Sequence, residues 1–188
     1  VVLFALSFMQ ENMGNFTINL NRLELFRRGV AIADNGDFNN ATARLAADAL
    51  DNGTNIAAED LPDNLDDIDG SHNGKNYVAY TFYIRNAGKT DLGYSAKLKV
   101  VSASKGVEKA ARVRVYRNGE PTTYAAAAAN GNPEPNTEPF ASKDVVTTIS
   151  HKNFRVGDVD KYTVVIWLDG DCLLYTSPSP RDVEESRM

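Results

Sequence analysis

Alternation of apolar and polar side chains is the feature that most constrains the fold of this chain. In the stretch near its C-terminal end, Tyr162, Val164 and Ile166 fall on one face, whereas Lys161 and Thr163 fall on the other. A period of two is typical of a strand that packs one face on a core. The same period occurs in four segments, which are 15–21, 77–85, 92–101 and 160–168.

Turn residues separate these segments and indicate how they connect. Asn118-Gly119 predicts a tight hairpin, because both residues tolerate positive φ. Residues 106–110 predict one helical turn, whereas the Ala-rich segment 41–50 could form a helix or remain irregular. We therefore predict an all-β fold, an antiparallel β-sandwich that is jelly-roll-like or Ig-like, with long surface loops and at most one or two short helices. The longest expected loops are 51–76 and 128–140.

The two ends of the chain differ in character from its middle. Residues 1–9 are uncharged and apolar, and we interpret them as the remnant of a signal peptide or N-terminal anchor; a buried first strand is the alternative. Residues 172–188 resemble translated sequencing-library adapter, so we treat them as a non-native tail. Residues 10–171 are then expected to form a single β-sandwich domain, truncated at its C-terminal end.

Charge and cysteine content exclude several classes of protein. The net charge of −5 is a poor match for nucleic acid, so we expect no nucleic-acid partner. The only cysteine is Cys172, which belongs to the adapter-like tail, so the remaining chain has no disulfide and no thiolate ligand. No segment of the mature chain is long and apolar enough for a stable membrane span.

Residues that could carry a reaction are few. His72 lies in a turn and His151 near a strand end, outside any His-Glu-x-x-His pattern, and no Gly-x-Ser-x-Gly elbow occurs. We therefore predict no catalytic residue, no metal ligand and no cofactor. A pair of carboxylates for glycoside hydrolysis stays open, because the spacing of such a pair exists only in three dimensions.

One loop of the chain is strongly acidic. Calcium prefers clustered carboxylate and carbonyl oxygens, so this loop could hold a weak calcium site. A solvated acidic loop is the other interpretation, and the sequence leaves the choice open. The acidic residues are Asp60, Asp63, Asp66, Asp67 and Asp69.

A basic patch and a group of aromatic residues offer two candidate binding surfaces. Tyr80 and Phe82 are expected in the core, whereas Tyr77, Tyr83 and Trp167 lie on the opposite strand faces, which are either exposed or covered. We expect Arg112 and Arg114 to point to solvent. The patch comprises Lys105, Lys109, Arg112, Arg114 and Arg117.

Three stretches resemble a known group of exported proteins. Tyr80-Thr-Phe-Tyr-Ile-Arg-Asn-Ala-Gly88, followed by Tyr94-Ser-Ala-Lys-Leu98, resembles the strand, Asn-x-Gly turn and strand of the camelysin/TasA-like β-sandwich proteins of Gram-positive bacteria. Residues 14–20 and 161–170 resemble an early and a late strand of such proteins. The resemblance implies a sandwich, export, and a role in envelope or matrix assembly. Some members carry a metallopeptidase label, but this chain has no matching metal motif.

The sequence therefore predicts an exported, non-enzymatic structural or assembly protein of the cell surface or extracellular matrix, located in the envelope or secreted. Its expected partners are copies of itself, joined by strand-edge pairing or through the N-terminal segment. The alternative is a module that binds a glycan or cell-wall polymer. A metallopeptidase-like enzyme is the remaining hypothesis.

Overall fold

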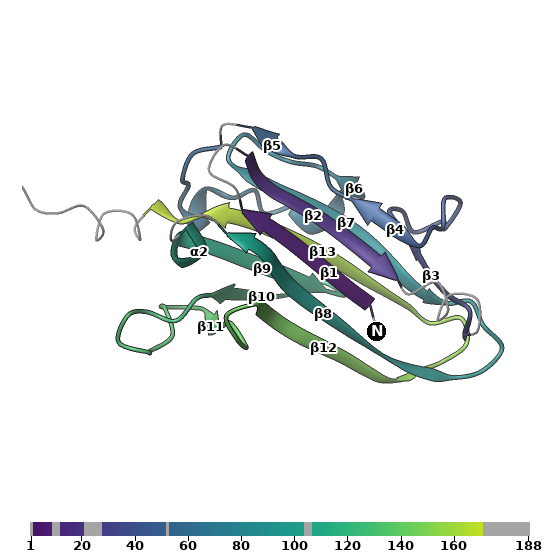
Figure 1. The fold of residues 1–188 in the computed structure, drawn as a ribbon. Coiled ribbons are helices and arrows are strands. Elements are labelled where there is room, and N and C mark those ends of the chain that lie inside the picture. The colour runs from purple at the N-terminus through teal and green to yellow at the C-terminus, as the bar shows by residue number, and fades with distance from the viewer. Residues whose placement is uncertain (1, 9–11, 21–27, 52, 104–106, 171–188) are drawn as a thin grey trace, which may run out of the picture.

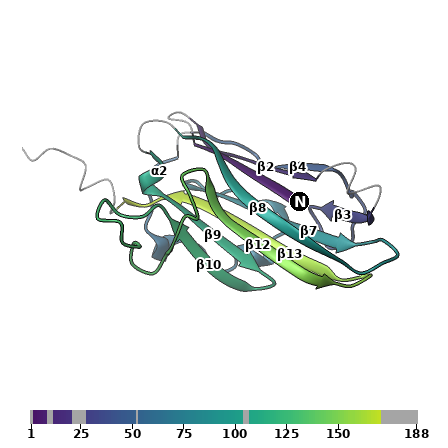
Figure 2. The same ribbon diagram turned by 60° about the horizontal axis from the view of Figure 1, so that its bottom comes forward.

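The chain forms two β-sheets that lie face to face. A computed structural model describes residues 2–8, 12–20, 28–51, 53–103 and 107–170. Figure 1 shows one sheet in front of the other, and Figure 2 shows the two layers from a second direction. Half of the structure is strand, so the predicted all-β, sandwich-like fold is confirmed. None of the helices in the described ranges is long and apolar enough to cross a membrane.

Sheet A has six strands in the order β12-β8-β1-β2-β4, with β5 also pairing with β2. Most neighbours are antiparallel, but β1 is parallel to β8. The strands are β1 (Val2–Phe8), β2 (Asn12–Leu20), β4 (Arg44–Ala46), β5 (Leu50–Asp51), β8 (Leu92–Ala103) and β12 (Val145–Phe154).

Sheet B has seven strands in the order β11-β10-β9-β13-β7-β3, with β6 also pairing with β7. Its long central strands are antiparallel to one another. The strands are β3 (Val30–Ala33), β6 (Gly70–Ser71), β7 (Tyr77–Asn86), β9 (Ala111–Arg117), β10 (Glu120–Ala125), β11 (Glu138–Pro139) and β13 (Val159–Leu168). The described helical segments are short, namely α2 (Val107–Ala110) and the 3-10 turns η1 (Ala58–Asp60) and η2 (Leu65–Asp67).

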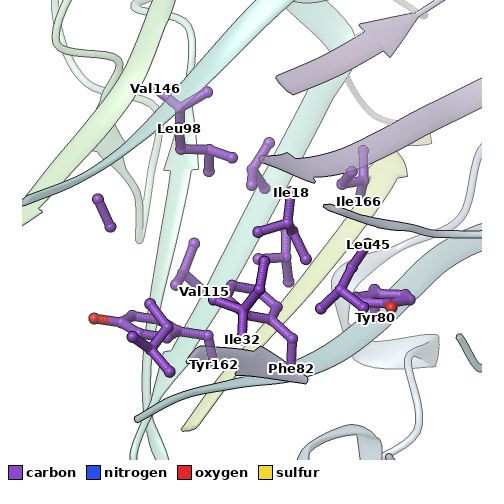
Figure 3. Packing of buried hydrophobic residues seen from close by; sticks show 14 of the residues in the cluster. Ile18, Ile32, Leu45, Tyr80, Phe82, Leu98, Val115, Val146, Tyr162 and Ile166 are labelled. Carbon is purple, nitrogen blue, oxygen red and sulfur yellow. The ribbon is translucent and has the colours of Figure 1, made fainter. Parts of the chain in front are cut away.

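The main core fills the space between the two sheets (Figure 3). Sheet A contributes Ile18 and Leu98, and sheet B contributes Phe82 and Tyr162, all of them fully or almost fully buried. The rings of Phe82 and Tyr162 stack with their centroids 5.4 Å apart. Tyr80 also lies in this core, so both aromatic residues predicted there are found in it.

A second, smaller core lies on the outer face of sheet B. There Leu61 and Leu65, from the loop that follows β5, pack on Val165 and Trp167 of β13. Trp167 is only 1% exposed. The segment expected to be a plain surface loop therefore covers the sheet, and this settles the open question of whether the second face of the central strands is covered.

Local predictions are confirmed at two turns. Asn118 and Gly119 have φ values of 51° and 91° and join β9 to β10, as expected for a tight hairpin. The predicted helical turn at 106–110 is α2. Residues 41–50 do not form a helix: β4 pairs with β2 there, with Leu45 buried between exposed Arg44 and Ala46. Pairing at the sheet edge has overridden the helical preference of alanine.

The apolar run at the start of the chain also pairs. Val2–Phe8 forms β1, with β2 on one side and β8 on the other, which matches the alternative of a first strand. Residues 9–11, Lys105 and the adapter-like tail 172–188 lie outside the described residues.

Candidate functional site

A polar cluster centred on a buried carboxylate joins the two sheets near one end of the sandwich. Its members come from four places: Tyr94 from β8, His151 from β12, Asp160 and Tyr162 from β13, and Asn118 from the β9–β10 turn. Tyr94 and His151 thus belong to sheet A, and the other three belong to sheet B. Asp160 sits at the centre and is 2% exposed.

Hydrogen bonds occupy both oxygens of the Asp160 carboxylate. Oδ2 accepts from the Tyr94 hydroxyl and lies 2.6 Å from Nδ1 of His151, and Oδ1 accepts from Nδ2 of Asn118 at 2.9 Å. Because Tyr94 donates to Asp160, its oxygen is free to accept from the Tyr162 hydroxyl, 2.6 Å away. The result is a chain of donors that ends on one carboxylate.

Electrostatics favours the charged form of this carboxylate. Burial alone would raise the pKa of Asp160, but the hydrogen bonds from His151, Tyr94 and Asn118, together with the charge of His151, outweigh it and hold the pKa below the usual aspartate value. The pKa of Tyr94 and that of Tyr162 are both raised, and burial is the largest cause of each shift. Both phenols therefore stay protonated and serve as donors at neutral pH.

This arrangement can hold the sheets together. A buried carboxylate that accepts several donors is stable only while all of them remain in place. Arg117, whose guanidinium is 3.8 Å from Asp160, adds a further positive charge from sheet B. The geometry supports the role of a polar clamp between β8 and β12 on one side and β13 on the other.

The sequence carried a signal for this cluster that composition alone does not reveal. Asp160 has the same parity along β13 as Tyr162, Val164 and Ile166, so it falls on the apolar face. A charged residue on such a face is buried and must find partners. Which partners it finds is not visible in the sequence, because Tyr94 and Asn118 are far from it along the chain.

His72 is placed differently from a solvated turn residue. Its Nδ1 lies 2.8 Å from the carbonyl oxygen of Gly70, and its Nε2 lies 2.9 Å from that of Leu65. The ring thus bridges β6 and the 3-10 turn η2. It fastens the loop that covers sheet B.

The acidic loop uses two of its five aspartates for the same purpose. Asp66 accepts from Thr163 at 2.7 Å and pairs with Lys161 at 3.5 Å, both on β13. Asp69 accepts from the Tyr83 hydroxyl at 2.6 Å. Asp60, Asp63 and Asp67 are exposed, as Asp69 is, whereas Asp66 is half-buried. Within the part of the chain that the structure describes, no three acidic, histidine or cysteine residues come close enough to hold a metal ion.

The predicted basic patch is not a solvent-facing surface. Arg112 is 4% exposed and forms an ion pair with Asp169 at 3.3 Å. The guanidinium carbon of Arg114 lies 5.3 Å from the centre of the Trp167 ring. Both arginines do face away from the main core, as parity predicts, but the second core lies on that side. Lys109 and Arg117 complete the described part of the patch; Lys109 is exposed and Arg117 joins the polar cluster.

The aromatic surface is likewise covered. Trp167 is buried, and Tyr77 packs against the same second core. Tyr83 is half-buried, with its ring edge-on to Phe38 at 6.3 Å. These residues stabilise the covering loop and offer little surface to a ligand.

Comparison with known proteins finds no matching family model, no matching curated protein and no matching solved structure.

Proposed function

We propose that this protein is a structural protein of the cell surface or extracellular matrix that assembles with copies of itself by exchanging β1. The observation that carries the proposal is the position of β1. It is the first described strand, yet it lies inside sheet A, with β2 on one side and β8 on the other.

Backbone pairing would supply the affinity for such an exchange. Seven residues of β1 pair with β2 and seven pair with β8. A copy of β1 from a neighbouring molecule would make the same hydrogen bonds, so exchange changes few contacts within the folded unit. If β1 left its own sheet, the edges of β2 and β8 that it covers would be exposed and could accept β1 of the next copy.

Exchange of this kind is directional. Each molecule would give β1 to one neighbour and receive it from another. A head-to-tail contact that does not close on itself generates an open filament. This is the behaviour expected of a matrix or surface-fibre subunit, and it agrees with the resemblance to exported sandwich proteins.

The outer edge of β12 favours assembly less. It is a ten-residue strand at the end of sheet A, but its pairing with β8 is interrupted at Val145/Thr147 and at His151/Phe154. Lys152 is exposed near the second interruption. Bulges and lysines on an edge strand oppose edge-to-edge pairing, so we favour the N-terminal strand as the joining element.

A pair of engineered cysteines tests the exchange. Ala5 of β1 lies opposite Thr17 of β2, and antiparallel partners are close enough for a disulfide. In the full chain carrying Cys172→Ser, Ala5→Cys and Thr17→Cys, oxidation at high concentration should give covalent multimers on a non-reducing gel. Oxidation of dilute monomer should instead lock β1 in place and prevent fibres seen by electron microscopy.

The matched control places the cysteines in a pair that exchange would not separate. Ser95 of β8 lies opposite Ser150 of β12. The variant Ser95→Cys with Ser150→Cys should therefore show no covalent multimers on the non-reducing gel, yet should still form fibres seen by electron microscopy. Assembly by the locked Ala5–Thr17 variant would overturn β1 exchange. A wild-type protein that stays monomeric at high concentration would overturn assembly altogether.

A further inference from the structure

The outer face of sheet A has a chemical character of its own, which we call the basic face. Its direction follows from burial: Ala96 and Leu98 of β8 are 1% exposed and point into the core, so Lys97 and Lys99 point outward. Leu45 is buried in the same way, and its neighbour Arg44 points outward and is exposed. The described basic face comprises Thr17, Arg44, Ser95, Lys97, Lys99, Thr148, Ser150 and Lys152.

Strand register sets the spacing of these groups. Thr148 lies opposite Lys97, and Ser150 lies opposite Ser95. Lys97 and Lys99 are two residues apart, so they stand roughly 6.7 Å from each other along β8. Across β1 and β2, Lys97 of β8 is in register with Arg44 of β4. The two residues are three strand spacings apart, which is about 14 Å. In this row, Leu3 of β1 and Asn19 of β2 lie between the two cations, so the cations stand on either side of the two central strands.

The charge of this sheet is opposite to that of the chain. The strands of sheet A carry four basic residues and one acidic residue, Asp51, whereas the whole chain has 20 lysines and arginines against 25 aspartates and glutamates. No ion pair among the described residues involves Arg44, Lys97, Lys99 or Lys152. Their charge is therefore available to a partner. No described segment crosses the front of sheet A in Figure 1.

We propose that the basic face binds an extended anionic polysaccharide. Such a chain repeats carboxylate or phosphate groups along its length, and its hydroxyls would bond to Ser95, Thr148 and Ser150. A flat array of cations suits a polymer better than a small anion, which would meet only one or two of them.

Other polyanions fit this face less well. Single-stranded nucleic acid is held by stacking on aromatic rings, and the described outward residues include none. A lipid surface is bound by apolar side chains in addition to cations. Among the side chains that the structure describes, the exposed large apolar ones are Ile68, Val156 and Val159, and none of these three lies on the basic face. The proposal stands on this surface alone and is independent of β1 exchange.

Affinity electrophoresis through gels that contain polygalacturonate tests the proposal on the full chain. The wild type should be retarded, and retardation should fall as salt is added. The face variant, Lys97→Gln, Lys99→Gln and Lys152→Gln, should raise the Kd by roughly tenfold or more, since single exposed charge pairs are weak but three are removed. Gels with neutral dextran should retard neither protein.

The control variant loses the same charge elsewhere. Lys75, Lys89 and Lys109 are exposed and lie outside sheet A, so their replacement by glutamine should leave the Kd unchanged. Circular dichroism should show that both variants fold. The proposal is overturned if the wild type is not retarded, or if both variants weaken equally. It is also overturned if phosphatidylglycerol vesicles or oligothymidine bind the wild type more tightly than polygalacturonate does.

Discussion

The outer faces of the two sheets are opposites. That of sheet B carries Ala79, Val165 and Trp167 and is covered by the loop that holds Leu61 and Leu65. The described outward side chains of sheet A are those of serine, threonine, lysine and arginine, and no described segment crosses its front (Figure 1). Both sheets also use their inner faces for one shared core. The contrast teaches that a strand with apolar residues on both of its faces is covered on both sides. A strand that carries hydroxyls and cations on one face is covered only on the other.

Removing the largest side chain of the covered face should have the largest effect. Trp167→Ala leaves a cavity beneath the loop and should lower the free energy of unfolding by about 3–5 kcal/mol. Urea unfolding followed by circular dichroism measures it. Trp167→Phe is the matched control: it keeps a ring and removes an indole N–H that has no partner among the described residues, so it should cost clearly less. Equal losses would mean that packing of the ring is not what matters.

The loop that covers sheet B should contribute nearly as much to the free energy of unfolding. Leu65 is 1% exposed, and Leu65→Ala should cost about 2–4 kcal/mol. Ile68 lies in the same loop but is 40% exposed, so Ile68→Ala should change the free energy of unfolding by less than about 0.5 kcal/mol. If the two variants behaved alike in urea, the loop would not be a structural layer.

A substitution in the polar cluster around Asp160 measures how much the contact between the two sheets contributes to stability, separately from either outer face. Asp160→Asn removes a charged acceptor and should cost about 1.5–3 kcal/mol at neutral pH. Because the folded pKa of Asp160 lies below the unfolded value, the unfolded chain binds more protons in acid. The stabilisation is therefore complete above about pH 5 and is lost as pH falls through about 3.9 towards the folded pKa.

Urea unfolding at several pH values checks that prediction. The difference between wild type and Asp160→Asn should shrink as the pH falls from about 5 to about 3. Asp63→Asn, a change at an exposed aspartate of the covering loop, should leave the pH profile unaltered. A wild-type-to-variant difference that stays constant over this range would show that the charge of Asp160 does not stabilise the fold.

A smaller effect is expected at the rim of the covered face. Arg114→Gln removes the cation above Trp167 and the bond from its Nε to Thr123 at 3.0 Å. The expected loss is about 0.5–1 kcal/mol, with a shift in tryptophan fluorescence because Trp167 is the only tryptophan. As a control, Arg155→Gln, at an exposed position, should change neither the free energy of unfolding nor the fluorescence. Unchanged fluorescence in Arg114→Gln would argue against the stacking contact.

The smallest effect belongs to the basic face. Lys97→Gln with Lys152→Gln should change the free energy of unfolding by less than about 0.5 kcal/mol, as expected for outward side chains that form no ion pair among the described residues. Thermal unfolding measures it. A loss comparable to that of Leu65→Ala would show that sheet A has a covering layer too, and the contrast between the sheets would fail.

Sequence reasoning located strands better than it located surfaces. Strand β13 and the hairpin at Asn118-Gly119 were predictable because side-chain parity and positive φ are local properties. The same parity placed Arg112 on an outward face but could not reveal that Leu61 and Leu65 bring a second layer over that side of the sheet. Contacts between distant segments depend on how loops return, and no local pattern encodes that.

What the sequence determined by itself is the two-faced strand, because alternating polarity and turn chemistry act over a few residues. Only the tertiary structure decided which second faces are buried, which distant groups surround Asp160, and that β1 lies inside sheet A. These follow from the packing of whole sheets and loops. There, the gain from burying apolar area and pairing backbone groups across long chain separations outweighs what any single segment prefers.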